Sequence, residues 1–144
     1  MKHHNQGRNA SSTIRLLATA LAGLFFAAAS QAAWISSHGP ITGNDISLPD
    51  SFNAHFPEKK FEVFVYSNVN QIGDVAICTS IVGVELRGKE QFPGKRYTYT
   101  GMHSNPQSNP LTIGQMRDLA LYCVNGSIKN MLSDDPDKVY EPNK

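Results

Sequence analysis

Hydrophobic and polar residues alternate along the middle of the chain, as in strands that bury one face. Residues 61–67 are rich in β-branched and aromatic types, which predicts a strand. Residues 68–74 supply the Asn, Gly and Asp of a turn. A second β-stretch covers residues 75–87 and is long enough to bend or bulge at Gly83. Together these segments predict an antiparallel hairpin.

A further alternating segment follows the hairpin. Residues 96–100 read as a short strand that places Tyr97 and Tyr99 on the same side. Glycine, proline and asparagine are frequent on either side of it, so residues 88–95 and 101–110 are predicted to be loops.

One segment has the spacing of an amphipathic helix, residues 113–125. Thr112 is placed as its N-cap, and Gln115 completes a capping box. Gly126 follows as the expected C-terminal stop, and residues 127–132 then read as a closing strand.

The two ends of the chain have weaker patterns. Residues 33–60 are interrupted by turn formers and predict a loop-rich arm, with one short strand near residues 46–48. Residues 133–144 are polar and contain two prolines, so they read as a disordered tail. The order of elements predicts an α+β fold. We expect a small β-rich domain, either an OB-like barrel or a curled antiparallel sheet, with one long helix packed on it.

Residues 1–32 have the three-part layout of a secretory signal peptide. Basic residues precede an apolar run at residues 16–29, and Ser30 and Ala32 occupy the −3 and −1 positions of a processing site. The run is shorter than the roughly 20 residues that span a membrane, although an uncleaved N-terminal anchor is the alternative. We therefore expect a secreted or periplasmic bacterial protein with no stable membrane span after processing.

Charge and cysteine content narrow the classes further. The chain has 144 residues, 13 basic and 12 acidic, which fits one domain and gives no electrostatic reason to expect a nucleic-acid partner. Its 2 cysteines exclude a four-cysteine zinc site. Cys78 falls in a predicted strand and Cys123 on the apolar face of the helix, so export favours a disulfide between them. Two buried free thiols are the alternative.

Signatures of catalysis are lacking in the sequence. The histidines His38, His55 and His103 are far apart, so we expect no metal site and no cofactor. His103 precedes a serine, but no orienting acid is evident, and we expect a binding protein rather than an enzyme. Tyr97, Tyr99 and His103 are the candidate ligand-binding residues, since tyrosine offers a stacking face and a hydroxyl. The alternative is that the tyrosines pack on a neighbouring element.

Three stretches resemble the B subunits of bacterial AB5 toxins, in particular the subtilase-cytotoxin and pertussis-like branch. Residues 70–74 lead into a strand that carries a cysteine, residues 119–126 are similar to the end of the family's helix, and Trp34 lies near the processed terminus. The resemblance implies an OB-type barrel in a homo-oligomeric ring that binds cell-surface glycans. None of the family's sugar-contacting residues can be assigned to a position in this chain.

Two functional hypotheses follow. The first is an exported, non-enzymatic binding subunit that recognises a cell-surface glycan. The second is a periplasmic inhibitor or immunity-type protein that blocks a partner enzyme through residues 88–95 or 101–110. A structural protein of the cell envelope is a third interpretation.

Overall fold

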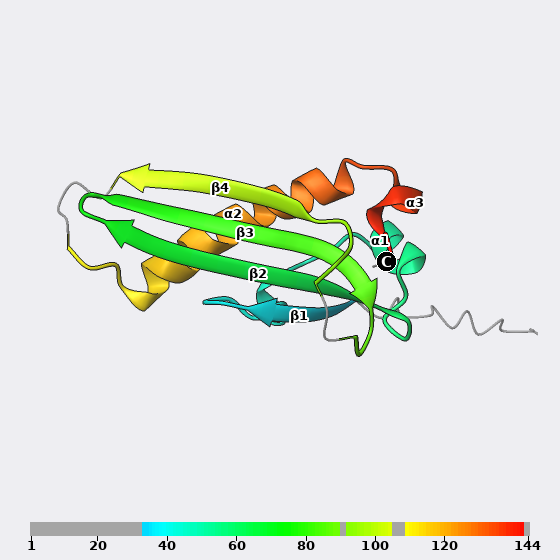
Figure 1. Cartoon of the computed structure of the whole chain (residues 1–144). Coiled ribbons are helices and arrows are strands. Elements are labelled where there is room, and N and C mark those ends of the chain that lie inside the picture. Colours follow the sequence, from blue (N-terminus) through cyan, green and yellow to red (C-terminus); the bar gives the residue numbers. More distant parts are fainter. Residues whose placement is uncertain (1–32, 90–91, 105–108, 143–144) are drawn as a thin grey trace, which may run out of the picture.

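The computed structural model describes residues 33–89, 92–104 and 109–142. A four-stranded sheet carries one long helix on one face, and short helices close one end (Figure 1). The elements in chain order are β1 (Trp34–His38), η1 (Gly43–Asp45), α1 (Asp50–His55), β2 (Phe61–Ile72), β3 (Val75–Leu86), β4 (Tyr97–Ser104), α2 (Ile113–Leu132) and α3 (Pro136–Val139).

The sheet has the order β1-β2-β3-β4. β2, β3 and β4 form an antiparallel meander, whereas β1 pairs parallel with β2. The predicted hairpin and the α+β class are confirmed. The sheet is open, so the predicted OB-like barrel is wrong. The alternative of an antiparallel sheet holds for β2, β3 and β4 but not for β1, which pairs in parallel.

The disulfide fastens the helix to the sheet. Cys78 of β3 and Cys123 of α2 are bonded, with their Cα atoms 6.0 Å apart, which confirms the predicted pair. Next to this bond, the Ser80 hydroxyl donates to the Cys123 carbonyl over 2.7 Å and lies 2.7 Å from the Ser127 hydroxyl. The buried serines therefore satisfy each other at the helix–sheet boundary.

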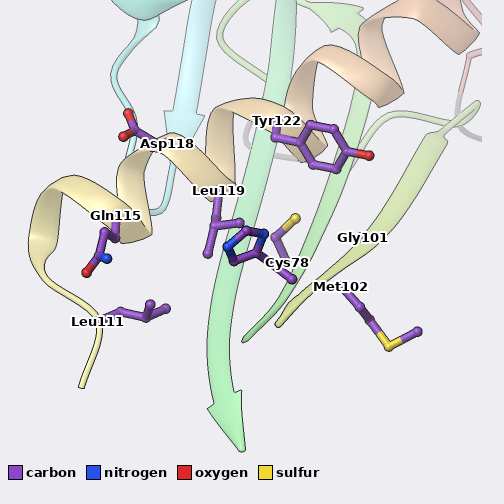
Figure 2. A pocket seen from close by; sticks show the side chains of 9 residues that line it. Cys78, Gly101, Met102, Leu111, Gln115, Asp118, Leu119 and Tyr122 are labelled. Carbon is purple, nitrogen blue, oxygen red and sulfur yellow. The ribbon is translucent and has the colours of Figure 1, made fainter. Parts of the chain in front are cut away.

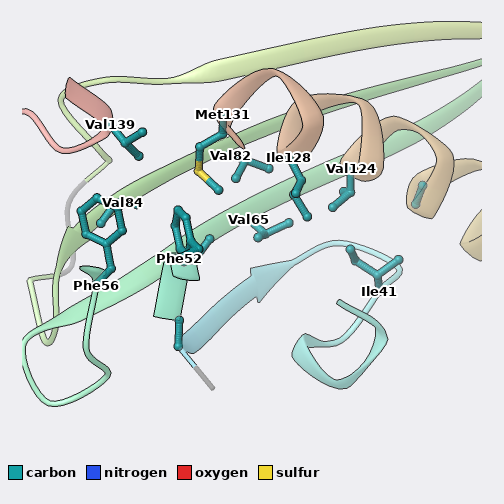
Figure 3. Packing of buried hydrophobic residues seen from close by; sticks show 13 residues of the cluster. Ile41, Phe52, Phe56, Val65, Val82, Val84, Val124, Ile128, Met131 and Val139 are labelled. Atoms are coloured by element: carbon teal, nitrogen blue, oxygen red, sulfur yellow. The ribbon is translucent and has the colours of Figure 1, made fainter. Parts of the chain in front are cut away.

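The core fills the space between α2 and the inward face of the sheet. β2 and β3 contribute valines at alternate positions, and α2 contributes residues at helical spacing (Figure 3). Phe52 of α1, Phe56 directly after this helix and Val139 of α3 close one end. The residues of the sheet and α2 in this core are Val63, Val65, Val82, Val84, Ala120, Val124, Ile128 and Met131.

The helix is longer than the sequence predicts. α2 continues through Gly126 to Leu132, so the expected stop at Gly126 and the closing strand at residues 127–132 are both wrong. Gly126 is required for packing instead, because a Cβ placed there would lie 2.5 Å from Cγ of Tyr99. The buried side chains of Ile128 and Met131 continue the apolar face of α2.

The strands also differ from expectation in detail. Residues 46–48 are not a strand; the N-terminal segment instead contributes β1, together with α1. The β2–β3 pairing runs through Gly83 without a bulge. β4 begins at Tyr97 and extends to Ser104, so the predicted loop 101–110 begins as strand.

The predictions for the two ends of the chain compare differently with the structure. The predicted signal peptide, residues 1–32, lies outside the described residues. The predicted disordered tail at residues 133–144 is corrected by α3, which buries Val139, and by Tyr140, whose ring lies 5.3 Å from that of Phe61. Apolar residues within a polar segment therefore anchor it to the core.

Candidate functional site

A cavity of about 540 Å³ lies between the first half of α2 and the adjoining ends of β3 and β4 (Figure 2). It combines apolar, aromatic and hydrogen-bonding side chains. The lining residues are Cys78, Gly101, Met102, His103, Leu111, Gln115, Asp118, Leu119 and Tyr122. Its volume falls within the roughly 300–1,000 Å³ of small-ligand sites.

Gly101 of β4 makes room for the aromatic wall of the cavity. A Cβ at this position would lie 2.8 Å from Cε1 of Tyr122 and 3.3 Å from Sγ of Cys78. The Tyr122 ring therefore rests directly over the β4 backbone, beside the disulfide. A larger residue at this position would displace the ring.

The Tyr122 ring is fixed in place and still accessible. Its hydroxyl lies 3.0 Å from the Tyr99 hydroxyl, and the two rings meet edge to face with centroids 5.7 Å apart. The hydrogen bond with Tyr122 and the closeness of the two hydroxyls raise the pKa of Tyr99. Tyr122 remains 57% exposed, so one face of a held ring is open to a ligand.

The entry to α2 is held by two glutamines. Gln71 of β2 accepts from the Leu111 backbone N–H over 3.0 Å and donates to the Asn109 carbonyl over 2.9 Å. The predicted capping box is confirmed, because Oε1 of Gln115 accepts from the backbone and the hydroxyl of Thr112. These bonds leave Nε2 of Gln115 without a partner among the described residues, and thus able to donate to a ligand.

The three predicted ligand-binding residues lie in different places relative to the cavity. His103 lines the cavity, whereas Tyr99 does not line it and forms a hydrogen bond with the Tyr122 hydroxyl. Tyr97 lies away from the cavity, where its hydroxyl donates to Asp134 over 2.7 Å. For Tyr97 and Tyr99, the alternative of packing against a neighbouring element describes the contacts better.

Sequence reasoning missed the contribution of α2. Gln115, Asp118 and Tyr122 stand at positions i, i+3 and i+7, which places them on one side of the helix. That spacing was a usable signal. However, nothing in the pattern says that β4 ends beside this stretch of helix.

In the described parts of the chain, no three or more His, Cys, Asp or Glu side chains are grouped so as to hold a metal ion. None of the helices described combines the length and apolar character needed to cross a membrane. Comparisons of the chain with family models, with curated proteins and with solved structures find no match.

Proposed function

We propose that this protein is an exported, non-enzymatic binding protein whose cavity between α2 and β4 takes a cell-surface glycan. The observation that carries the proposal is the accessible Tyr122 ring beside the side chains of Gln115, Asp118 and His103 in one cavity. A sugar presents an apolar C–H face and a rim of hydroxyls. An aromatic ring takes the face, while carboxylate, amide and imidazole groups bond to the hydroxyls.

The chemistry of the lining favours a neutral or weakly charged polar ligand. Asp118 accepts hydrogen bonds, Nε2 of Gln115 donates them, and His103 can do either with its two ring nitrogens. Met102, Leu111 and Leu119 supply apolar surface around these groups. The combination suits one or two sugar rings at the end of a glycan chain.

Export is the second part of the proposal. The disulfide between Cys78 and Cys123 is of a kind that persists in oxidising compartments, and residues 1–32 read as a signal peptide. The resemblance to AB5 toxin B subunits agrees with this role. We carry it over as a proposal for the role and for ring assembly, whereas the open sheet differs from the implied barrel.

The test is a glycan array probed with the processed protein and two matched tyrosine variants. Tyr122→Ala removes the aromatic wall, and we expect at least tenfold weaker binding to the best glycan. Tyr66→Ala removes another exposed tyrosine, on the opposite face of the sheet, and should leave binding unchanged. Circular dichroism checks that both variants fold.

Three results would contradict the proposal. The first is a folded wild-type protein that binds no glycan on the array, and the second is equal loss of binding in both variants. Native mass spectrometry supplies the third, which is a monomer that forms a one-to-one complex with an enzyme of the same compartment and binds no glycan. That result would favour the inhibitor hypothesis.

A further inference from the structure

A second hollow lies on the face of the sheet opposite α2, away from the proposed glycan site. Its volume is about 590 Å³, and β1, β2, β3 and the segment before β4 contribute to it. Two carboxylates stand among rings in this hollow. The residues that matter are His38, Glu62, Phe64, Tyr66, Glu85 and Phe92.

Gly83 explains why this face is hollowed. A Cβ at Gly83 would lie 2.5 Å from the Lys95 carbonyl oxygen and 2.6 Å from Cβ of Pro93. The segment before β4 therefore crosses directly over the outer face of β3. This crossing brings the Phe92 ring to 5.0 Å from the ring of Phe64, the strand partner of Gly83. The chain thus builds an aromatic wall above the sheet.

The carboxylates of the hollow face each other across the hairpin. Glu62 of β2 and Glu85 of β3 are direct partners in the register. Glu85 is only 6% exposed, and its Oε2 is buried without a hydrogen-bond partner among the residues that the structure describes. In the part of the chain that the structure describes, neither glutamate forms an ion pair. A buried polar oxygen left unpartnered is costly, and a ligand that donates to it would recover that cost.

The aromatic rings give the hollow a preference for an organic cation. The ring of His38 lies 5.3 Å from that of Phe64, and Phe92 is 55% exposed. Ring faces attract ammonium and guanidinium groups, and carboxylates bond to their N–H donors. A hard divalent ion prefers a shell of six or more oxygens, which these walls do not offer.

We propose that this hollow binds an organic cation, an alkylammonium or alkylguanidinium group, with its charged head at Glu62 and Glu85 and its alkyl stem against Phe64 and Phe92. The site is distinct from the glycan cavity, so either proposal can fail without the other. The shared chemistry has two sources, a small free amine or a Lys or Arg side chain of a protein partner.

Binding at this site should depend on pH. Burial, together with the neighbouring carboxyl of Glu62, raises the pKa of Glu85 to about 7. His38 and Tyr66 are the other titratable groups of the hollow. An adjoining hollow that Glu85 also borders is lined by Lys89, Tyr140 and Glu141. A cation displaces the proton of Glu85, so affinity should rise about tenfold between pH 6 and pH 8.

The experiment titrates the processed protein with butylguanidinium and butylammonium at pH 6, 7 and 8, followed by NMR. Butylurea serves as the neutral analogue of the same shape. We expect saturable binding of the two cations, none of butylurea, and stronger binding at pH 8. Glu85→Gln keeps the shape without the charge and should weaken binding at least tenfold. Asp74→Asn removes a carboxylate at the other end of the same hairpin and should change nothing.

A second variant guards against a folding artefact, and a peptide separates the two sources. Phe92→Ala truncates an exposed ring and should weaken cation binding several-fold in a folded protein. Tighter binding of a Gly-Gly-Arg-Gly-Gly peptide than of butylguanidinium indicates a protein side chain, and exclusion of the peptide indicates a small amine. The proposal is overturned if neither cation saturates, if butylurea binds equally well, or if Glu85→Gln and Phe92→Ala bind as wild type.

Discussion

Replacing Gly126 with alanine tests how α2 packs on the sheet. Gly126 lies inside this helix, where alanine is ordinarily favoured by about 1 kcal/mol. The added Cβ would lie 2.5 Å from Cγ and 2.6 Å from Cδ2 of Tyr99. Contacts this short force the Tyr99 ring to move. The gain in helix propensity and the cost of overpacking therefore oppose each other at one position.

The overpacking should outweigh the propensity. Inserting a methyl group into a well-packed site costs about 1–3 kcal/mol. Moving the ring also disturbs the 3.0 Å hydrogen bond between the hydroxyls of Tyr99 and Tyr122, and such a bond contributes about 1 kcal/mol. Against a gain of about 1 kcal/mol in propensity, we expect Gly126→Ala to lower the free energy of unfolding by about 1–3 kcal/mol.

Gly114 provides a matched control in the first turn of the same helix. The atom nearest to a Cβ there is Oγ1 of Thr112, at 3.9 Å, so alanine fits without strain. Gly114→Ala should raise the free energy of unfolding by up to about 1 kcal/mol. Urea unfolding followed by circular dichroism measures both variants. The two substitutions, identical in chemistry and in the same helix, should have opposite signs.

A double-mutant cycle with Tyr99→Ala identifies the cause. Without the ring, Gly126→Ala should become stabilising, as Gly114→Ala is. An equal cost in both backgrounds would show that Gly126 is needed for its backbone conformation, as at a helix end, and would refute the packing argument. A stabilising effect in the wild-type background would refute it as well.

Three further predictions concern the disulfide and two carboxylates. Replacing Cys78 and Cys123 together by alanine should cost about 4 kcal/mol in urea unfolding, from the entropy of a loop with a sequence separation of 45, and a loss below about 1 kcal/mol would contradict this. The hydrogen bond from Lys95 is the main cause that holds the pKa of Asp134 at about 2. The ionised carboxylate of Asp134 therefore stabilises the fold above about pH 4, and this stabilisation is lost as the pH falls towards 2. Asp134→Asn should flatten that part of the acid-unfolding curve. Burial raises the pKa of Glu85 to about 7, so stability should fall as the pH rises from about 4.5 to about 7, and Glu85→Gln should abolish this slope.

Local signals in the sequence predicted the elements that depend on neighbouring residues. The hairpin, the start of α2 at its capping box and the apolar stripe that carries Cys123 all follow from patterns within a few residues. The disulfide added one long-range constraint, and with it the helix could be placed on β3.

The predictions that were wrong concern residues whose conformation is set by contacts with residues far away in the sequence. A glycine after a helical stripe ordinarily marks a helix end. Gly126 instead lies inside the helix, where the Tyr99 ring of β4 leaves no room for a side chain. β1 is a strand because it pairs in parallel with β2, and its own five residues carry little periodicity. Gly83 likewise makes no bulge; it leaves room for the segment before β4, which crosses directly over it.

The proposed glycan site shows the same division. His103 was a candidate from the sequence, and the helix spacing of Gln115, Asp118 and Tyr122 was available in it. The cavity itself exists because Gly101 admits the Tyr122 ring over β4. That approach depends on the register of β4 and on how α2 lies across the sheet, which no local pattern contains.

The most direct test of the central claim is an NMR titration of the isotope-labelled, processed protein with the glycan that binds best on the array. We expect saturable shifts at the backbone amides of Met102, His103, Gln115 and Asp118, with those of Tyr66 and Glu85 on the opposite face unmoved. Shifts confined to the opposite face, or no saturable shift with any glycan, would contradict it.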